Sequence, residues 1–169
     1  MKSESTELLR AELNDLRRMS THLQESLKSC ADLPTNPATE DLWSERVEAF
    51  MSRFARTADL LVNKSLRTLV AFELEDPGTL LDILQKAEKR GIISSGANFR
   101  KIKQLRNMIV HDYAGEDLAE SFTLCRQWTP ELLEGIIGFE KYLSAKFQIH
   151  AADVCLPPAL PLLKAEEPK

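Results

Sequence analysis

Residues 43–72 read WSERVEAFMSRFARTADLLVNKSLRTLVAF, and this stretch decides the fold. Its apolar side chains recur mostly three or four residues apart, a spacing that places them on one face of an α-helix. They are Trp43, Val47, Phe50, Met51, Phe54, Ala58, Leu61, Leu66, Leu69 and Val70. Asp76-Pro77-Gly78 ends the pattern. A helix of this length predicts the central member of a helical bundle.

A second helix is predicted upstream, over residues 4–31, because leucines recur there at helical spacing. They are Leu9, Leu13, Leu16, Leu23 and Leu27. So narrow an apolar seam either pairs with a second copy of the chain or packs on the chain's own core. Over so few heptads, packing on the own core is the preferred interpretation.

Further helices are predicted downstream from their start and stop signals. Thr79 is placed to cap a short helix that ends at Lys89-Arg90-Gly91. Ser94 or Ser95 begins the next helix, which runs to His111. Two more helices are expected over residues 117–128 and 130–147, with Thr129 capping the second one at Pro130. The sequence therefore predicts an all-α, antiparallel helical bundle.

The composition indicates one globular domain. The chain has 169 residues, 43% of them hydrophobic and 28% charged, and Leu, Glu, Ala, Lys and Arg dominate. We expect a single domain over residues 1–149, in which residues 1–35 form an additional N-terminal helix. Several prolines follow His150, so residues 150–169 are expected to be a mobile or partner-bound tail.

Charge and cysteine content narrow the function classes. The net charge of −4 gives no broad attraction to polyphosphate, so any nucleic-acid contact needs a local basic patch. Three cysteines without C-x-x-C spacing favour a reducing cytoplasm, and we expect no signal peptide and no membrane span. His22, His111 and His150 are scattered without paired carboxylates, so no metal site and no cofactor are expected.

One segment concentrates positive charge in this acidic chain. Arg100, Lys101, Lys103 and Arg106 lie within seven residues, and His111 follows. A solvated helix face that ends in a histidine favoured by the helix dipole explains this pattern without any function. The alternative is a binding site for nucleic-acid phosphate along the same helix.

A resemblance favours the functional interpretation. The run Arg106-Asn107-Met108-Ile109-Val110-His111-Asp112-Tyr113 resembles the Arg-polar-x-x-x-His-x-Tyr motif of HepT toxins in the HEPN superfamily. The surroundings are similar too, with Gly115 soon after the tyrosine and Asp117-Leu118 at the start of the next helix. The resemblance covers about residues 39–147 and implies an RNA-cutting toxin that works as a homodimer with paired motifs in one cleft.

Helical geometry supports a need for two copies. Arg106 and His111 point about 140° apart on a regular helix, so one helix does not bring them together. Either the chain leaves α geometry near His111, or a second copy supplies the missing group. An imidazole, whose ordinary pKa is about 6.5, suits proton transfer, and a guanidinium binds phosphate oxygens. Arg106, Asn107 and His111 are thus the predicted catalytic residues, with Arg100, Lys101 and Lys103 extending the RNA contact.

The resemblance also implies how such a toxin is controlled. In HepT pairs the motif tyrosine receives AMP from a minimal nucleotidyltransferase antitoxin of the MntA type, so Tyr113 is the predicted modification site. Added AMP brings bulk and negative charge to the place where RNA phosphate binds. Two other classes stay open: a non-catalytic HEPN subunit that serves a nucleotidyltransferase, and a structural adaptor that dimerises through the N-terminal leucine seam.

Overall fold

The structure is a computed structural model, and it describes residues 2–34, 41–111 and 118–152. Within these ranges every regular element is a helix, which confirms the predicted all-α class. The elements are α1 (Lys2–Ser29), α2 (Asp41–Asp59), the π-helical segment η1 (Leu60–Ser65), α3 (Leu66–Phe72), α4 (Leu80–Lys89), α5 (Gly96–His111) and α6 (Leu118–Phe147). None of them is long and apolar enough to cross a membrane.

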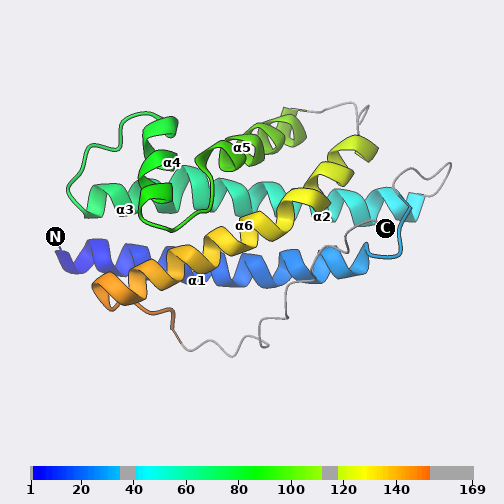
Figure 1. Ribbon diagram of the computed structural model, residues 1–169. Coiled ribbons are helices and arrows are strands. Elements are labelled where there is room, and N and C mark those ends of the chain that lie inside the picture. Colours follow the sequence, from blue (N-terminus) through cyan, green and yellow to red (C-terminus); the bar gives the residue numbers. More distant parts are fainter. Residues whose placement is uncertain (1, 35–40, 112–117, 153–169) are drawn as a thin grey trace, which may run out of the picture.

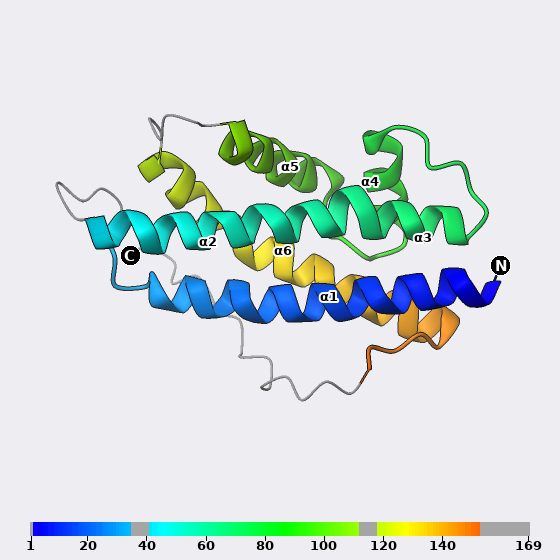
Figure 2. The ribbon, with the colours of Figure 1, turned by 180° about the vertical axis from the view of Figure 1, so that it is seen from behind.

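Two long rods of the bundle lie side by side and antiparallel. One is α1, and the other is the continuous run of α2, η1 and α3 (Figures 1 and 2). Leu9, Leu13, Leu16 and Leu23 of α1 are completely buried. The prediction that the leucine seam packs on the chain's own core is confirmed. An adaptor that dimerises through this seam is excluded, because the seam is not available to a partner.

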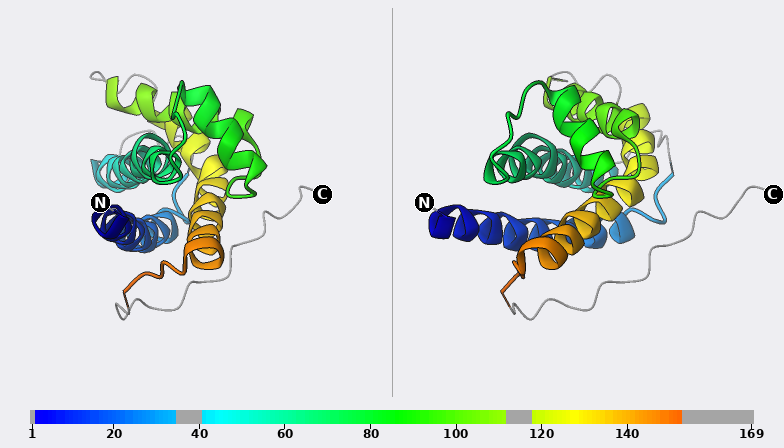
Figure 3. Two further views of the ribbon diagram at one scale, coloured as in Figure 1. Left: turned by 90° about the vertical axis from the view of Figure 1, so that its left-hand side faces the viewer. Right: turned by 60° about the vertical axis from the view of Figure 1, so that its left-hand side comes forward.

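Helix α6 crosses both rods, as the end-on view makes clear (Figure 3). Arg17 of α1 binds Glu140 of α6 through two hydrogen bonds, from Nε to Oε2 at 3.1 Å and from Nη2 to Oε1. Ala152, beyond the end of α6, donates its backbone N–H to Asn14 Oδ1 at 2.9 Å. The C-terminal end of α6 is thereby fixed against α1.

The predicted break before Pro130 is wrong, since α6 is one helix from Leu118 to Phe147 with Pro130 inside it. A proline costs a helix one backbone hydrogen bond, but packing on both sides outweighs that loss here. Phe122 before the proline and Phe139 after it are both fully buried in the same core. Thr129 does not cap a new helix; its hydroxyl donates to the carbonyl of Cys125 at 2.6 Å.

The predicted signals around α4 and α5 are confirmed. Thr79 caps α4, accepting a hydrogen bond from the Asp82 backbone N–H while the Asp82 side chain accepts one from Thr79 N–H. Gly91 ends the helix with φ +68°, a conformation that suits glycine. Ser95 precedes α5, and its hydroxyl accepts a hydrogen bond from Asn98 N–H at 3.3 Å.

Glycine allows α6 to lie directly on the connection between α4 and α5. A Cβ added at Gly138 would stand 2.0 Å from the carbonyl oxygen of Ile92, and one at Gly135 would stand 2.5 Å from Cζ of Phe99. Real Cβ atoms do not approach so closely, so both positions need glycine for this packing. The contact fixes the start of α5 relative to the core.

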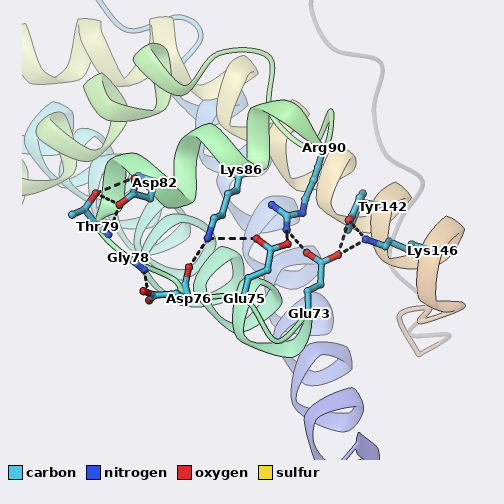
Figure 4. A network of polar contacts seen from close by, with 10 residues as sticks. All are labelled: Glu73, Glu75, Asp76, Gly78, Thr79, Asp82, Lys86, Arg90, Tyr142 and Lys146. Atoms are coloured by element: carbon cyan, nitrogen blue, oxygen red, sulfur yellow. Dashed lines mark hydrogen bonds and ion pairs between the residues drawn. The ribbon is translucent and has the colours of Figure 1, made fainter.

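A network of polar contacts ties the end of α3 to α4 and α6 (Figure 4). Glu73 Oε1 accepts hydrogen bonds from Tyr142 Oη at 2.7 Å and Lys146 Nζ at 2.5 Å. Its other oxygen pairs with Arg90 at 2.5 Å, and Arg90 also reaches Glu75 at 2.6 Å. We call Glu73, Glu75, Arg90, Tyr142 and Lys146 the Glu73 network. It joins the consecutive helices α3 and α4 to α6, which lies far from them in the sequence.

Candidate active site

The outer face of α5 carries three of the predicted site residues, Arg100, Asn107 and His111. Arg100, Gln104, Asn107 and His111 are spaced four, three and four residues apart, so they form one stripe along the helix. Arg100, Gln104 and His111 are exposed, and Asn107 is half-buried. Met108 and Val110 flank the stripe with 47% and 45% of their surface exposed. The face therefore combines polar groups with two exposed apolar side chains.

Arg106 points away from this stripe, toward α2. Its Nη2 forms an ion pair with Oδ1 of Asp59 at 2.9 Å, and its Nη1 donates to Oδ1 of Asn107 at 3.1 Å. Nε is buried and has no hydrogen-bond partner among the described residues. The structure thus brings the side chains of Arg106 and Asn107 into direct contact.

His111 is the last residue of α5, which keeps α geometry up to this position. Within the described residues the helix shows no distortion that would bring the imidazole back to Arg106. Arg106 contacts α2, whereas His111 lies on the exposed face. Tyr113 and Asp112, with Gly115 and the start of the next segment at Asp117, fall outside the described residues.

The three predicted RNA-binding cations occupy different environments. Arg100 is exposed on the same stripe as Asn107 and His111. Lys101 extends over the ring of Trp128, with Nζ 5.5 Å from the ring centroid. Lys103 turns to the α2 side, where Nζ lies 3.9 Å from Oδ1 of Asp59, and its side chain is only 17% exposed. Arg100 is thus the cation best placed to continue the stripe.

Burial lowers the pKa of Lys103, and the nearby charge of Arg106 lowers it further, whereas Asp59 acts in the opposite direction. Two cations therefore share one carboxylate in this corner. Asp59 and its neighbour Asn63 are site residues that the sequence interpretation missed. The available signal was the step from Leu61 to Leu66, whose five residues exceed the helical spacing and mark the π-helical segment.

Other groups that sequence reasoning set aside remain apart from this site. Cys30 and Cys125 are buried free thiols, and burial raises the pKa of Cys125 far above its usual range, so it is a core residue. His22 lies 3.4 Å from Glu25, and His150 lies 3.2 Å from the Ser144 hydroxyl. Across residues 2–34, 41–111 and 118–152, no cluster of three His, Cys, Asp or Glu side chains could hold a metal ion.

A family model for ribonuclease HepT-like proteins matches residues 44–137, more than half of the chain. The chain belongs to the HepT-like ribonuclease family. No curated protein matches it. The region matched in this HepT-like chain starts in α2, includes all of α5 with Arg106 to His111, and ends within α6. Helix α1 and the C-terminal tail lie outside the match, as the sequence resemblance predicted.

The region matched by the HepT-like family model includes the interface of α2 and α5. Both sides of the Arg106–Asp59 contact lie inside the matched region. The site is built from one long core helix and one helix that displays the motif, and both rest on the same buried core.

Proposed function

We propose that this chain is the toxin of a HEPN and nucleotidyltransferase pair and that it cuts RNA without a metal ion. The proposal depends on how the N–H donors of the Arg106 guanidinium are paired. A guanidinium has five N–H donors. Asp59 and Asn107 take one each and Nε is buried, so among the described residues one hydrogen on Nη1 and one on Nη2 have no acceptor and are available to a ligand. Those two donors match the spacing of two phosphate oxygens.

The reaction fits the side chains of this segment. The 2′-hydroxyl of a ribose attacks the adjacent phosphorus, a new O–P bond forms, and the bond to the 5′-oxygen of the next nucleotide breaks. The products are a cyclic phosphate and a 5′-hydroxyl end. His111 takes the proton of the 2′-hydroxyl or supplies one to the leaving oxygen. Arg106 stabilises the additional negative charge on the phosphate as the bond forms.

Two copies are part of the proposal. Arg106 and His111 leave α5 in different directions, so one chain does not direct both at the same phosphate. Met108 and Val110 are exposed beside the stripe and give a partner apolar surface to cover. A two-fold axis along this face sets the His111 of each copy near the Asn107 stripe of the other. Arg100 then continues the positive surface along the RNA strand.

Control by the antitoxin completes the proposal. The partner is a minimal nucleotidyltransferase of the MntA type. It transfers AMP from ATP to the Tyr113 hydroxyl, so that the new O–P bond replaces the bond to the leaving pyrophosphate. The added phosphate places negative charge two residues after His111, where RNA phosphate is expected to bind, and blocks the site by repulsion and bulk.

The decisive test incubates the full-length protein with total RNA in excess chelator, beside His111→Ala and Arg106→Ala. We expect cutting by the intact protein alone, with cyclic phosphate at the new ends. Equal RNA loss in all three samples would overturn the catalytic proposal and leave a non-catalytic, substrate-binding subunit of a nucleotidyltransferase as the function. Met108→Asp, Val110→Asp doubly substituted protein should be monomeric by light scattering and inactive; an active monomer would contradict the paired site.

The regulatory part has its own measurement. After co-expression with the neighbouring nucleotidyltransferase, intact-mass and peptide mass spectrometry should show one AMP on Tyr113, and Tyr113→Phe should stay unmodified and toxic. Full neutralisation of the toxin with an unmodified Tyr113 would indicate silencing by binding alone.

A further inference from the structure

Asp59 gathers three side chains on a single oxygen. Its Oδ1 accepts a hydrogen bond from Asn63 Nδ2 at 2.6 Å and pairs with Arg106 Nη2 at 2.9 Å. Lys103 Nζ lies 3.9 Å from the same atom. Two of these groups come from α5 and one comes from the same rod as Asp59. The carboxylate of Asp59 is therefore the electrostatic contact between α2 and α5.

The backbone around Asp59 is unusual in a way that bears on this role. Asp59 directly precedes η1, in which the N–H of Leu66 donates to the carbonyl of Leu61, five residues back. Such π-helical turns inside α-helices cost some stability and occur often at functional sites. Here Leu61, Val62 and Ser65 remain buried while Asn63 reaches back to Asp59. The carboxylate is thereby held from its own helix as well as from α5.

Arg106 depends on this carboxylate for its direction. Its Nε–H is buried without a partner among the described residues, and its neighbour Asn107 reaches only Nη1. Without Asp59 nothing described holds Nη2, and Lys103 then stands beside Arg106 with no opposite charge between them. Repulsion between two cations would turn the long, flexible side chain away from its present direction.

We propose that Asp59, held by Asn63 at the π-helical segment, is a positioning residue for Arg106 in RNA cutting. The inference rests on the proposed function. In this proposal Asp59 does not touch the phosphate; it fixes the guanidinium, whose remaining Nη1 and Nη2 hydrogens have no acceptor among the described residues and bind the phosphate. A preoriented donor is worth more in the transition state than one that must first be ordered, so the effect falls on kcat.

The test compares Asp59→Asn with Glu48→Gln in the full-length protein. Each change removes one negative charge from α2, but Glu48 is exposed and forms no hydrogen bond or ion pair among the described residues. With a fluorescent RNA oligonucleotide selected as a substrate of the intact protein, Asp59→Asn should lower kcat about 10- to 100-fold and change KM less than about threefold. Glu48→Gln should leave both unchanged. Asn63→Ala should shift kcat in the same direction by a smaller factor.

A second measurement follows Arg106 without relying on activity. Its Nε–H signal in a nitrogen NMR spectrum, assigned by its loss in Arg106→Ala, should exchange with solvent at least about tenfold faster in Asp59→Asn than in Glu48→Gln. Equal exchange rates, or a kcat of Asp59→Asn equal to or above that of the intact protein, would overturn the positioning role. A rise in kcat would mean that Asp59 competes with phosphate for Arg106.

The two proposals fail in different ways. If the intact protein and Glu48→Gln cut no RNA while Nε–H exchange still depends on Asp59, the proposed function is wrong and Asp59 is only a structural partner of Arg106. If both cut RNA and Asp59→Asn cuts equally well, only the positioning role is wrong. A thermal unfolding curve for each variant shows whether its measured rate belongs to folded protein.

Discussion

Glu73 and Asp59 each lie beside two cationic side chains, but the two sites differ in how completely the hydrogen-bond donors of those cations are paired among the described residues. Glu73 is 6% exposed and binds Arg90, Tyr142 and Lys146, while Arg90 is additionally bound to Glu75 (Figure 4). The Asp59 side chain is 41% exposed, and two N–H donors of its partner Arg106 have no acceptor among the described residues. The charged groups of the Glu73 network pair with one another. In the Asp59 corner, which consists of Asp59, Asn63, Lys103 and Arg106, part of the guanidinium has no acceptor among the described residues.

The difference follows from position in the fold. The Glu73 network lies where α3, α4 and α6 meet, so its bonds join segments that would otherwise separate. The Asp59 corner lies under the exposed face of α5, which presents Asn107, His111 and the flanking Met108. We expect the largely buried Glu73, which pairs with Arg90 and Lys146, to contribute mainly to stability, and the half-exposed Asp59 beside Arg106 to contribute mainly to the proposed RNA site. Variants in the two regions should therefore have opposite profiles.

Among these variants, we expect Arg106→Ala to have the largest effect on RNA cutting and Arg90→Ala to have almost none. Arg106→Ala should lower RNA cutting by about 10³-fold, because the guanidinium and both of its N–H donors to the reacting phosphate are lost. Its unfolding free energy should change by less than about 1 kcal/mol, since the Asp59 pair is partly exposed. Cutting is measured by gel with end-labelled RNA, and stability by urea unfolding. A loss of unfolding free energy as large as that of Arg90→Ala would contradict the expected difference between the Glu73 network and the Asp59 corner.

Arg90→Ala should show the reverse profile. The Arg90 side chain is 14% exposed and pairs with two carboxylates, so its removal leaves Glu73 and Glu75 with fewer partners. We expect a loss of about 2–3 kcal/mol of unfolding free energy, with RNA cutting by the folded protein unchanged. Urea unfolding and the same gel assay measure the two quantities. Reduced cutting at full stability would show that the network serves the site.

Thr79→Ala tests the same region through a helix cap. It removes the hydroxyl that accepts the Asp82 N–H and so leaves a donor at the start of α4 unsatisfied. The expected loss is about 1 kcal/mol, and activity should stay the same. Chemical unfolding followed by circular dichroism measures it. Thr79→Ser, which keeps the hydroxyl, is the matched control and should behave like the intact protein.

The Glu73 network also predicts a pH dependence. Burial alone would raise the pKa of Glu73, but hydrogen bonds from Lys146 and Tyr142 and the charge of Arg90 outweigh it, and the pKa is lowered. A lowered pKa gives stability that is complete above the ordinary glutamate pKa of about 4.3 and lost as pH falls through the folded value.

The measurement compares Glu73→Gln with the intact protein by urea unfolding from pH 7 to pH 3. The gap in unfolding free energy should be constant at neutral pH and narrow below about pH 4.3. Glu48→Gln, with the same change at an exposed position, should match the intact protein throughout. A gap that widens on acidification would mean that the ionised carboxylate does not stabilise the fold.

The smallest expected effect is a gain. Leu74 follows α3 with φ +59° and is 92% exposed, so a leucine occupies a conformation that favours glycine and buries almost nothing. Leu74→Gly should raise the unfolding free energy by about 0.5–1 kcal/mol, with no effect on cutting. Leu74→Ala, which keeps the Cβ, should gain little. A loss in Leu74→Gly would show that this leucine has a stabilising contact.

Local signals were sufficient for much of the fold. The leucine spacing of α1, the Thr79 cap, Gly91 and the Ser95 start of α5 depend on neighbours in the chain, and each was predicted. The break at Pro130 was predicted wrongly because it depends on tertiary packing and not on neighbouring residues in the chain. Whether a helix continues through a proline depends on what both halves pack against, here the core around Phe122 and Phe139, and no local signal contains that information.

The sequence by itself determined the helical class, the family resemblance and the motif from Arg106 to His111, because helical periodicity and residue chemistry are written along the chain. Only the tertiary structure decided that Arg106 turns toward α2 and meets Asp59, while His111 stays on the exposed face. Asp59 and Arg106 are 47 positions apart and belong to different helices. Their contact exists because a shared core sets α2 against α5, so it follows from packing and not from spacing.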